Sequence, residues 1–216
     1  MPTAPYYLQD GTRVPGTTTI IGRFKESGAL IRWAYNRGKD GLELYESRDK
    51  AAELGTIVHE MVEKFIKGED ITDMTTSLSI DDEKQVMSAF DAFEEWFESN
   101  KFKIVAQEMH LVSEVYRYGG TPDAIAYDSK GRLCLLDWKT SNSVHADYIY
   151  QLAFYRILWN ENNTDMQLTG GSHLCRFAKE YGDFTHHYFP NIDEAERAAV
   201  IMAELYKIDQ QVKKRC

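Results

Sequence analysis

Residues 120–140, GTPDAIAYDSKGRLCLLDWKT, contain the pattern that decides the fold. Two segments rich in apolar residues, 120–128 and 132–140, lie on either side of the turn sequence DSKG at 128–131. Aspartate and glycine at such positions favour a tight turn, so the two segments predict an antiparallel pair of strands. The segment 103–116, KIVAQEMHLVSEVY, is rich in β-branched and apolar residues and predicts an earlier strand of the same meander.

The second strand of this pair carries charge where a core strand should be apolar. Side chains alternate between the faces of a strand, so Asp137 and Lys139 share a face with Leu133 and Leu135. A carboxylate and an ammonium group on a buried strand are costly unless they are paired or bound to a metal ion. A salt bridge at the exposed end of the strand is the simpler alternative.

The turn sets the register of the two strands. If residues 129–131 form a three-residue loop with Gly131 in the left-handed conformation, residue 128 pairs with residue 132, and Asp123 faces Asp137. Two adjacent carboxylates repel each other, and a divalent cation between them would offset that repulsion. Pro122 lacks a backbone N–H donor, so we expect the sheet to open there into a cleft.

The rest of the chain alternates between helical and extended patterns. Residues 17–21, TTTII, favour a β conformation, and 167–178 and 184–190 predict a hairpin around residues 180–183. We expect helices, from apolar residues at three- and four-residue spacing, at 29–37, 50–67, 81–99, 144–160 and 193–213. Acidic residues open the helix at 81–99, and Gly68 is expected to end the helix at 50–67. This order predicts one α/β (α+β) domain over residues 1–216, with a central mixed sheet flanked by helices.

Composition narrows the class of protein. The 216 residues are 43% hydrophobic and 27% charged, as in an ordinary soluble domain, and no run of about 18 apolar residues predicts a membrane span. Three scattered cysteines and no secretory leader favour a reducing, cytoplasmic location. A net charge of −9 argues against coating nucleic acid by bulk charge. Residues 11–40 nevertheless carry six basic residues against two acidic ones, either as a solvated patch or as a rim facing phosphates.

Several motifs together resemble those of a known family. Thr121-Pro122-Asp123, followed after thirteen residues by Asp137-Trp138-Lys139, resembles the signature of the PD-(D/E)XK nuclease superfamily. The other matches resemble the RecB-type branch, in family order: the opening segment 14–20 (VPGTTTI) with Leu30, Trp33 and Ala34, then the helix motif 55–59 (GTIVH), then the glutamine–tyrosine motif 151–155 (QLAFY). The branch with an iron–sulfur cluster uses four cysteines, so three point to the cluster-free branch.

The resemblance implies a restriction-endonuclease-like core and a role for each matching residue. Asp123 and Asp137 would bind Mg²⁺ or Mn²⁺ with the backbone carbonyl of Trp138, and His59 would add a nitrogen ligand. An imidazole ligand suits Mn²⁺ at least as well as Mg²⁺. Lys139 would orient the attacking water or stabilise the pentavalent phosphorus. Gln151 and Tyr155, one helical turn apart, would contact the phosphate or the strand that carries Lys139.

Other residues have weaker claims, each with an ordinary structural alternative. Glu63 lies one turn from His59 and is either close to the metal site or solvent-facing, and Glu108 is a weaker acidic candidate. Tyrosines 6, 7, 148 and 150 could stack on unpaired bases, although core positions are commoner for tyrosine. A zinc-protease motif fails because Glu63 stands where the second histidine is needed, and no phosphate-binding loop of a helicase motor is present.

These features lead to an expected function with two alternatives. We expect a free-standing, metal-dependent DNA exonuclease that processes DNA ends or single strands in replication, repair or recombination, with a protein partner in such a complex. One alternative is a nucleic-acid-binding or scaffold module without catalysis. The other is an RNA-directed nuclease. The sequence leaves digestion polarity, strand preference and oligomeric state open.

Overall fold

A five-stranded sheet forms the centre of the structure, a computed structural model that describes residues 4–25, 28–41, 44–141, 143–177 and 184–215. The strands lie in the order β3-β6-β7-β8-β9. Neighbouring strands are antiparallel except β7 and β8, which are parallel, so the sheet is mixed as predicted. The five strands are β3 (Lys103–Gln107), β6 (Ala124–Tyr127), β7 (Leu133–Thr140), β8 (Ser172–Phe177) and β9 (Phe184–Phe189).

The turn between β6 and β7 has the predicted geometry. Gly131 adopts the left-handed conformation with φ of 73°, and the Asp128 N–H donates to the Arg132 carbonyl at 2.9 Å. Ala124 therefore stands opposite Leu136. The same register brings Asp123, immediately before β6, beside Asp137 of β7.

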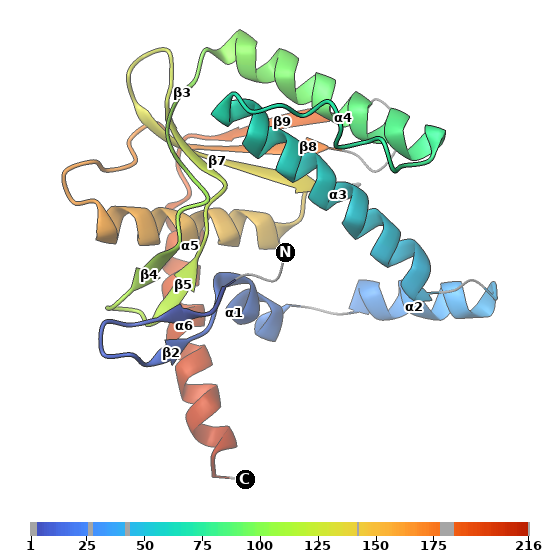
Figure 1. Cartoon of the computed structure of the whole chain (residues 1–216). Helices are drawn as coiled ribbons and strands as arrows, with labels where there is room; N and C mark the ends of the chain where they lie inside the picture. Colours follow the sequence, from blue (N-terminus) through green and yellow to red (C-terminus); the bar gives the residue numbers. More distant parts are fainter. Residues whose placement is uncertain (1–3, 26–27, 42–43, 142, 178–183, 216) are drawn as a thin grey trace.

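Helices cover both faces of the sheet (Figure 1). α3 (Leu44–Lys67) and α4 (Ile80–Asn100) cover one face, while α1 (Thr17–Phe24), α5 (Ala146–Asn162) and α6 (Asp193–Lys213) lie on the other. Alternate residues of β7 divide between the two cores: Leu136 and Trp138 pack toward α3 and α4, and Leu133 and Leu135 pack toward α5. α2 (Gly28–Lys39) lies away from the sheet at the start of α3.

The helix ends follow local chemistry. Gly68, with φ of 71°, ends α3, and the Glu69 N–H donates to the Lys64 carbonyl at 2.9 Å. The Ser79 hydroxyl caps α4 by accepting from the Asp82 N–H, and three acidic residues occupy its first turn. The five predicted helices are confirmed, although α3 begins at Leu44 rather than residue 50 and α5 covers 146–162 rather than 144–160. No helix in the described part of the chain is long and apolar enough to cross a membrane.

The prediction of β structure at residues 17–21 is wrong, because this segment begins α1. Ile20 and Ile21 are buried in the core against α5 and α6, so tertiary packing overrides the local preference of β-branched residues. Gly16 stays extended before the helix, and the Thr17 hydroxyl donates to the Gly119 carbonyl at 3.0 Å. This hydrogen bond anchors the start of α1 beside the strand of Gly119.

The single strand predicted at 103–116 is also wrong, because the chain turns at Glu108, which has φ of 47°. β3 therefore pairs with β6, whereas β4 (Leu111–Ser113) pairs with β5 (Tyr118–Gly120) in a separate two-stranded sheet. A second small sheet joins β1 (Tyr6–Tyr7) to β2 (Arg13–Val14). The predicted segment 167–178 contributes only β8 from Ser172, and the predicted turn at 180–183 lies outside the described residues.

Candidate active site

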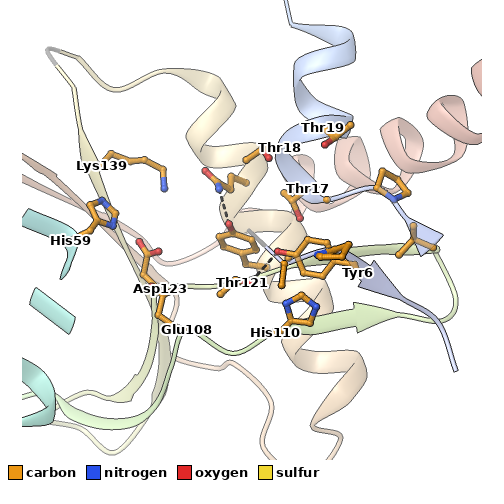
Figure 2. Close-up of a pocket in the computed structure, with 18 of the residues that line it drawn as sticks. Tyr6, Thr17, Thr18, Thr19, His59, Glu108, His110, Thr121, Asp123 and Lys139 are labelled. Atoms are coloured by element: carbon orange, nitrogen blue, oxygen red, sulfur yellow. Dashed lines mark hydrogen bonds between the residues drawn. The ribbon is translucent and has the colours of Figure 1, made fainter. Parts of the chain in front are cut away.

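A large pocket opens where β6 begins and β7 ends (Figure 2). Its volume is about 1410 Å³, and its walls come from the N-terminal segment, α1, α3, α5, α6 and the β6–β7 pair. The predicted site residues that line it are His59, Asp123, Trp138, Lys139, Gln151 and Tyr155. Asp137 lies immediately behind this surface with its side chain fully buried. The fold thus gathers at one place residues that are far apart in the sequence.

Asp137 and Lys139 form an ion pair at the end of β7. The Lys139 Nζ lies 2.6 Å from Asp137 Oδ2, and the lysine side chain retains only 17% exposure. Asp137 Oδ1 is buried and has no hydrogen-bond partner among the described residues. The alternative of a solvent-exposed salt bridge at the strand end therefore does not describe this pair.

Asp123 completes a cluster of two acids and one ammonium group. Its Oδ2 accepts from the Trp138 N–H at 2.7 Å, and the register of β6 and β7 places its carboxylate beside that of Asp137. Burial raises the pKa of Asp123, and burial together with the charge of Asp123 raises the pKa of Asp137 to about 6. Burial opposes the charge on Lys139, but Asp137 and Asp123 raise its pKa above the ordinary value. A positive charge here therefore offsets the repulsion between Asp123, which is partly exposed, and the fully buried Asp137.

His59 reaches this cluster from α3. Burial and then the charge of Lys139 lower its pKa to about 4, so the imidazole is neutral at neutral pH, and it hydrogen-bonds with the Trp138 backbone. Gly55 lies one turn earlier, and a Cβ there would stand 3.1 Å from the Thr140 side chain. The absent side chain lets α3 approach β7 closely, which holds His59 over the carboxylates.

The opposite side of the cluster is formed by α5. Gln151 and Tyr155 are one turn apart and both line the pocket, with the Gln151 Nε2 donating to the Tyr155 hydroxyl at 2.7 Å. Tyr155 is buried, and burial raises its pKa well above the ordinary value, so the hydroxyl stays protonated. The pair therefore presents neutral hydrogen-bonding groups to the pocket.

Several pocket residues had only weak signals in the sequence, or none. Glu108 lines the pocket, and its N–H donates to the Asp123 carbonyl at 3.1 Å. Desolvation, followed by the charges of Asp123 and Glu63, raises the pKa of Glu108 to about 8. Tyr6, His110 and the hydroxyl-bearing run 17–19 form another wall (Figure 2). The turn at Glu108 and the strand pairing of residue 6 are tertiary features with no local pattern.

The basic stretch at residues 11–40 does not form one free surface. Arg23 pairs with Asp209 at 2.8 Å, and Lys25 pairs with Asp147 at 2.5 Å. Arg13 lines the pocket. The side chains of Leu30 and Trp33 lie outside the described part of the structure.

This arrangement of acids and lysine on two sheet strands can be compared with known proteins. The model of the PD-(D/E)XK nuclease superfamily matches residues 30–216. The chain belongs to this superfamily. The observed mixed sheet with flanking helices is the PD-(D/E)XK fold. A search of curated proteins finds no match.

Two solved structures of nucleases are similar to this superfamily member. The "Putative exonuclease" of Eubacterium rectale is 15% identical with a TM-score of 0.48, and the match covers 70% of this chain and 64% of that one. This chain therefore spans less than two thirds of that protein. The alkaline exonuclease LHK-Exo of Laribacter hongkongensis is 11% identical with a TM-score of 0.33, covering 58% and 71% of the two chains.

Nucleases of this superfamily typically use divalent metal ions, and the residues at the pocket fit one. Within the described residues, no three histidine, cysteine or acidic side chains are arranged as a complete metal site. The cluster instead contains a buried carboxylate oxygen without a partner, on Asp137, and a lysine ammonium against the other oxygen. Carboxylate oxygens and one imidazole nitrogen are donors that suit Mg²⁺ or Mn²⁺. Binding would need the Lys139 ammonium to yield part of its contact with Asp137.

Proposed function

We propose that this chain is a metal-dependent DNA exonuclease of the RecB type, without an iron–sulfur cluster, that hydrolyses phosphodiester bonds at DNA ends or in single strands. The observation that carries the proposal is the buried Asp137 carboxylate, with one oxygen unpartnered, beside Asp123 and Lys139 at a large pocket. Burying Asp137 beside a second acid costs stability, and a catalytic cation bound there would explain why the chain keeps both acids. We propose repair, recombination or replication as its setting.

Each residue of the cluster has a separate role in the proposed hydrolysis. Asp123, Asp137, the Trp138 carbonyl and His59 would hold the ion, and Lys139 would hold the attacking water or stabilise charge on the phosphate. When bound, the ion supplies charge neutralisation at the scissile phosphate and lowers the pKa of a bound water. The neutral His59 imidazole is ready to act as a ligand without first losing a proton. Gln151 and Tyr155 would donate hydrogen bonds to phosphate oxygens from the α5 side of the pocket.

The test is digestion of end-labelled single- and double-stranded DNA, with matched RNA, in Mg²⁺, Mn²⁺ or EDTA. We expect the wild-type protein to shorten DNA from its ends only with metal, and Asp137→Asn and Asp123→Asn to be inactive. Asp165→Asn, at an exposed acid outside the pocket, is the matched control and should keep the wild-type rate.

The same assay separates the alternatives. Preferred cleavage of RNA would make the chain an RNA-directed nuclease. Binding of DNA without cleavage in either metal would favour the scaffold module. Cleavage by Asp137→Asn at the wild-type rate would remove the basis of the proposal.

A further inference from the structure

Two stacked rings form the pocket wall that faces the charged cluster. The rings of Tyr6 and His110 have centroids 4.2 Å apart and planes inclined by 12°, and both residues line the pocket. Figure 2 shows this pair on the opposite side of the pocket from His59 and Lys139. We call it the Tyr6–His110 stack. The proposed catalytic mechanism gives it no role.

The position of the Tyr6 ring is fixed on several sides. The side chain is 7% exposed and packs with Leu8 and Val14. A Cβ at Gly119 would overlap this ring, and one at Gly16 would stand 3.2 Å from it. Glycine at these two positions therefore leaves the space that the ring fills, so Tyr6 forms a rigid support for His110.

Each member of the stack is connected to Asp123 by a hydrogen bond and a short stretch of chain. The Tyr6 hydroxyl hydrogen-bonds with the Thr121 hydroxyl at 3.0 Å, two residues before Asp123. His110 comes two residues after Glu108, whose N–H donates to the Asp123 carbonyl. Two residues of chain span at most roughly 7 Å, so the stack lies within a nucleotide or two of a phosphate at Asp123.

His110 is the accessible member of the stack. It is exposed, whereas Tyr6 behind it is buried. A planar ring supported from behind and open to a pocket is the arrangement on which unpaired bases stack in single-strand-binding proteins. Tyr6, one of the tyrosines considered as base-stacking candidates from the sequence, acts here as the support and His110 as the contact surface.

We propose that the Tyr6–His110 stack is a nucleobase subsite that holds one unpaired base near the scissile phosphate. This inference rests on the proposed function for the identity of the ligand, and it makes the bound strand locally single-stranded at that base. Because every base has a planar face, the subsite selects for unpaired strands and tolerates any sequence.

The test measures binding of fluorescent single-stranded oligonucleotides in EDTA, with one abasic nucleotide placed at each position in turn from the end. For the wild-type protein we expect one position at which the missing base weakens binding roughly 5- to 100-fold. His110→Ala should weaken binding of the intact oligonucleotide by the same factor and should lose the abasic penalty at that position. His110→Phe, which keeps the flat ring, should retain both affinity and penalty.

The controls separate stacking from other roles and from the proposed function. His145→Ala, at an exposed histidine outside the pocket, should bind as the wild type does, and urea unfolding should show that each variant is folded. An abasic penalty that persists in His110→Ala, or affinity lost equally in His110→Phe, overturns the subsite. If the wild-type protein cleaves DNA but shows no abasic position that weakens binding, the subsite is overturned and the proposed function stands. If the wild-type protein shows this weakened binding but cleaves neither DNA nor RNA, the proposed function is overturned and the subsite stands.

Discussion

Asp137→Asn should remove a pH-dependent loss of stability from the metal-free protein. Asp137 is fully buried, and its pKa is raised from 3.8 to about 6. The native state therefore binds the carboxyl proton of Asp137 more tightly than the unfolded chain does. The stability that comes from this tighter binding is fully present below pH 3.8 and is lost as the pH rises through 6. The shift of about two units corresponds to about 3 kcal/mol in all, of which about 2 kcal/mol falls between pH 4.5 and pH 7.5.

The assay is urea unfolding in EDTA at these two pH values. Other groups titrate in the same range, including His59, so the informative quantity is the pH-dependent change in wild type minus that in Asp137→Asn. We expect this difference to be about 2 kcal/mol, whereas Asp91→Asn, at an exposed acid, should show none. For a chain of this length that is a change of roughly 4–8 °C in the melting temperature.

A bound divalent metal ion should reverse the loss of stability that the wild type shows as the pH rises. A divalent ion at the carboxylates favours their charged forms, so Mn²⁺ should stabilise the wild type more at pH 7.5 than at pH 4.5 and should leave Asp137→Asn nearly unchanged. Equal pH dependence in the wild type and the variant would refute the claim that a buried, destabilising carboxylate occupies this position.

Three further changes test His59, the approach of α3 to β7, and a buried histidine on β8. His59→Ala should weaken Mn²⁺ binding more than Mg²⁺ binding in calorimetric titrations, because imidazole is the softer donor; equal losses would contradict its role as a ligand. Gly55→Ala places a Cβ 3.1 Å from Thr140 and should lower kcat/KM roughly 10-fold with a small change in melting temperature, whereas an unchanged rate would show that α3 adjusts freely. His173 has a pKa lowered to about 4 by burial, so its contribution to stability is present above pH 6.5 and lost on acidification. His173→Phe should therefore gain about 2 kcal/mol at pH 5 relative to pH 7 in urea unfolding, and no gain would refute this.

The sequence was most informative where one local interaction determines the geometry. A single glycine, Gly131, sets the loop between β6 and β7, and the loop sets the register that brings Asp123 beside Asp137. The end of α3 at Gly68 is likewise local, because a residue in the left-handed conformation determines it, and the acidic first turn of α4 is a local signal too. These features need no knowledge of distant contacts.

The features that the sequence did not predict depend on contacts between distant segments. Residues 17–21 are helical because Ile20 and Ile21 pack into the core against α5 and α6. The β preference of these residues, which depends only on local sequence, does not include that packing. His110 and Tyr6 are 104 positions apart, and their stacking requires β1 to lie against β5 and β4. The nuclease motifs thus point to the charged side of the pocket. On the aromatic side the sequence offers Tyr6 as one candidate among several tyrosines, and only the fold shows that it stacks on His110.

The position of the charged cluster in the sheet also explains how one strand can be both core and active site. From Leu133 to Trp138 every residue of β7 is buried, and the strand becomes partly accessible only at Lys139 and Thr140. The apolar residues on both faces supply burial that offsets the cost of Asp137, at roughly 25 cal/mol for each Å² of apolar surface. Asp137 is the last buried residue but one in β7, and the Lys139 ammonium group reaches it from the pocket side. One residue earlier, at Leu136, a carboxylate would face the other core, among the apolar side chains of α3 and α4. The alternation of the strand therefore leaves few positions at which a carboxylate can be desolvated and still meet a cation, and Asp137 occupies one of them.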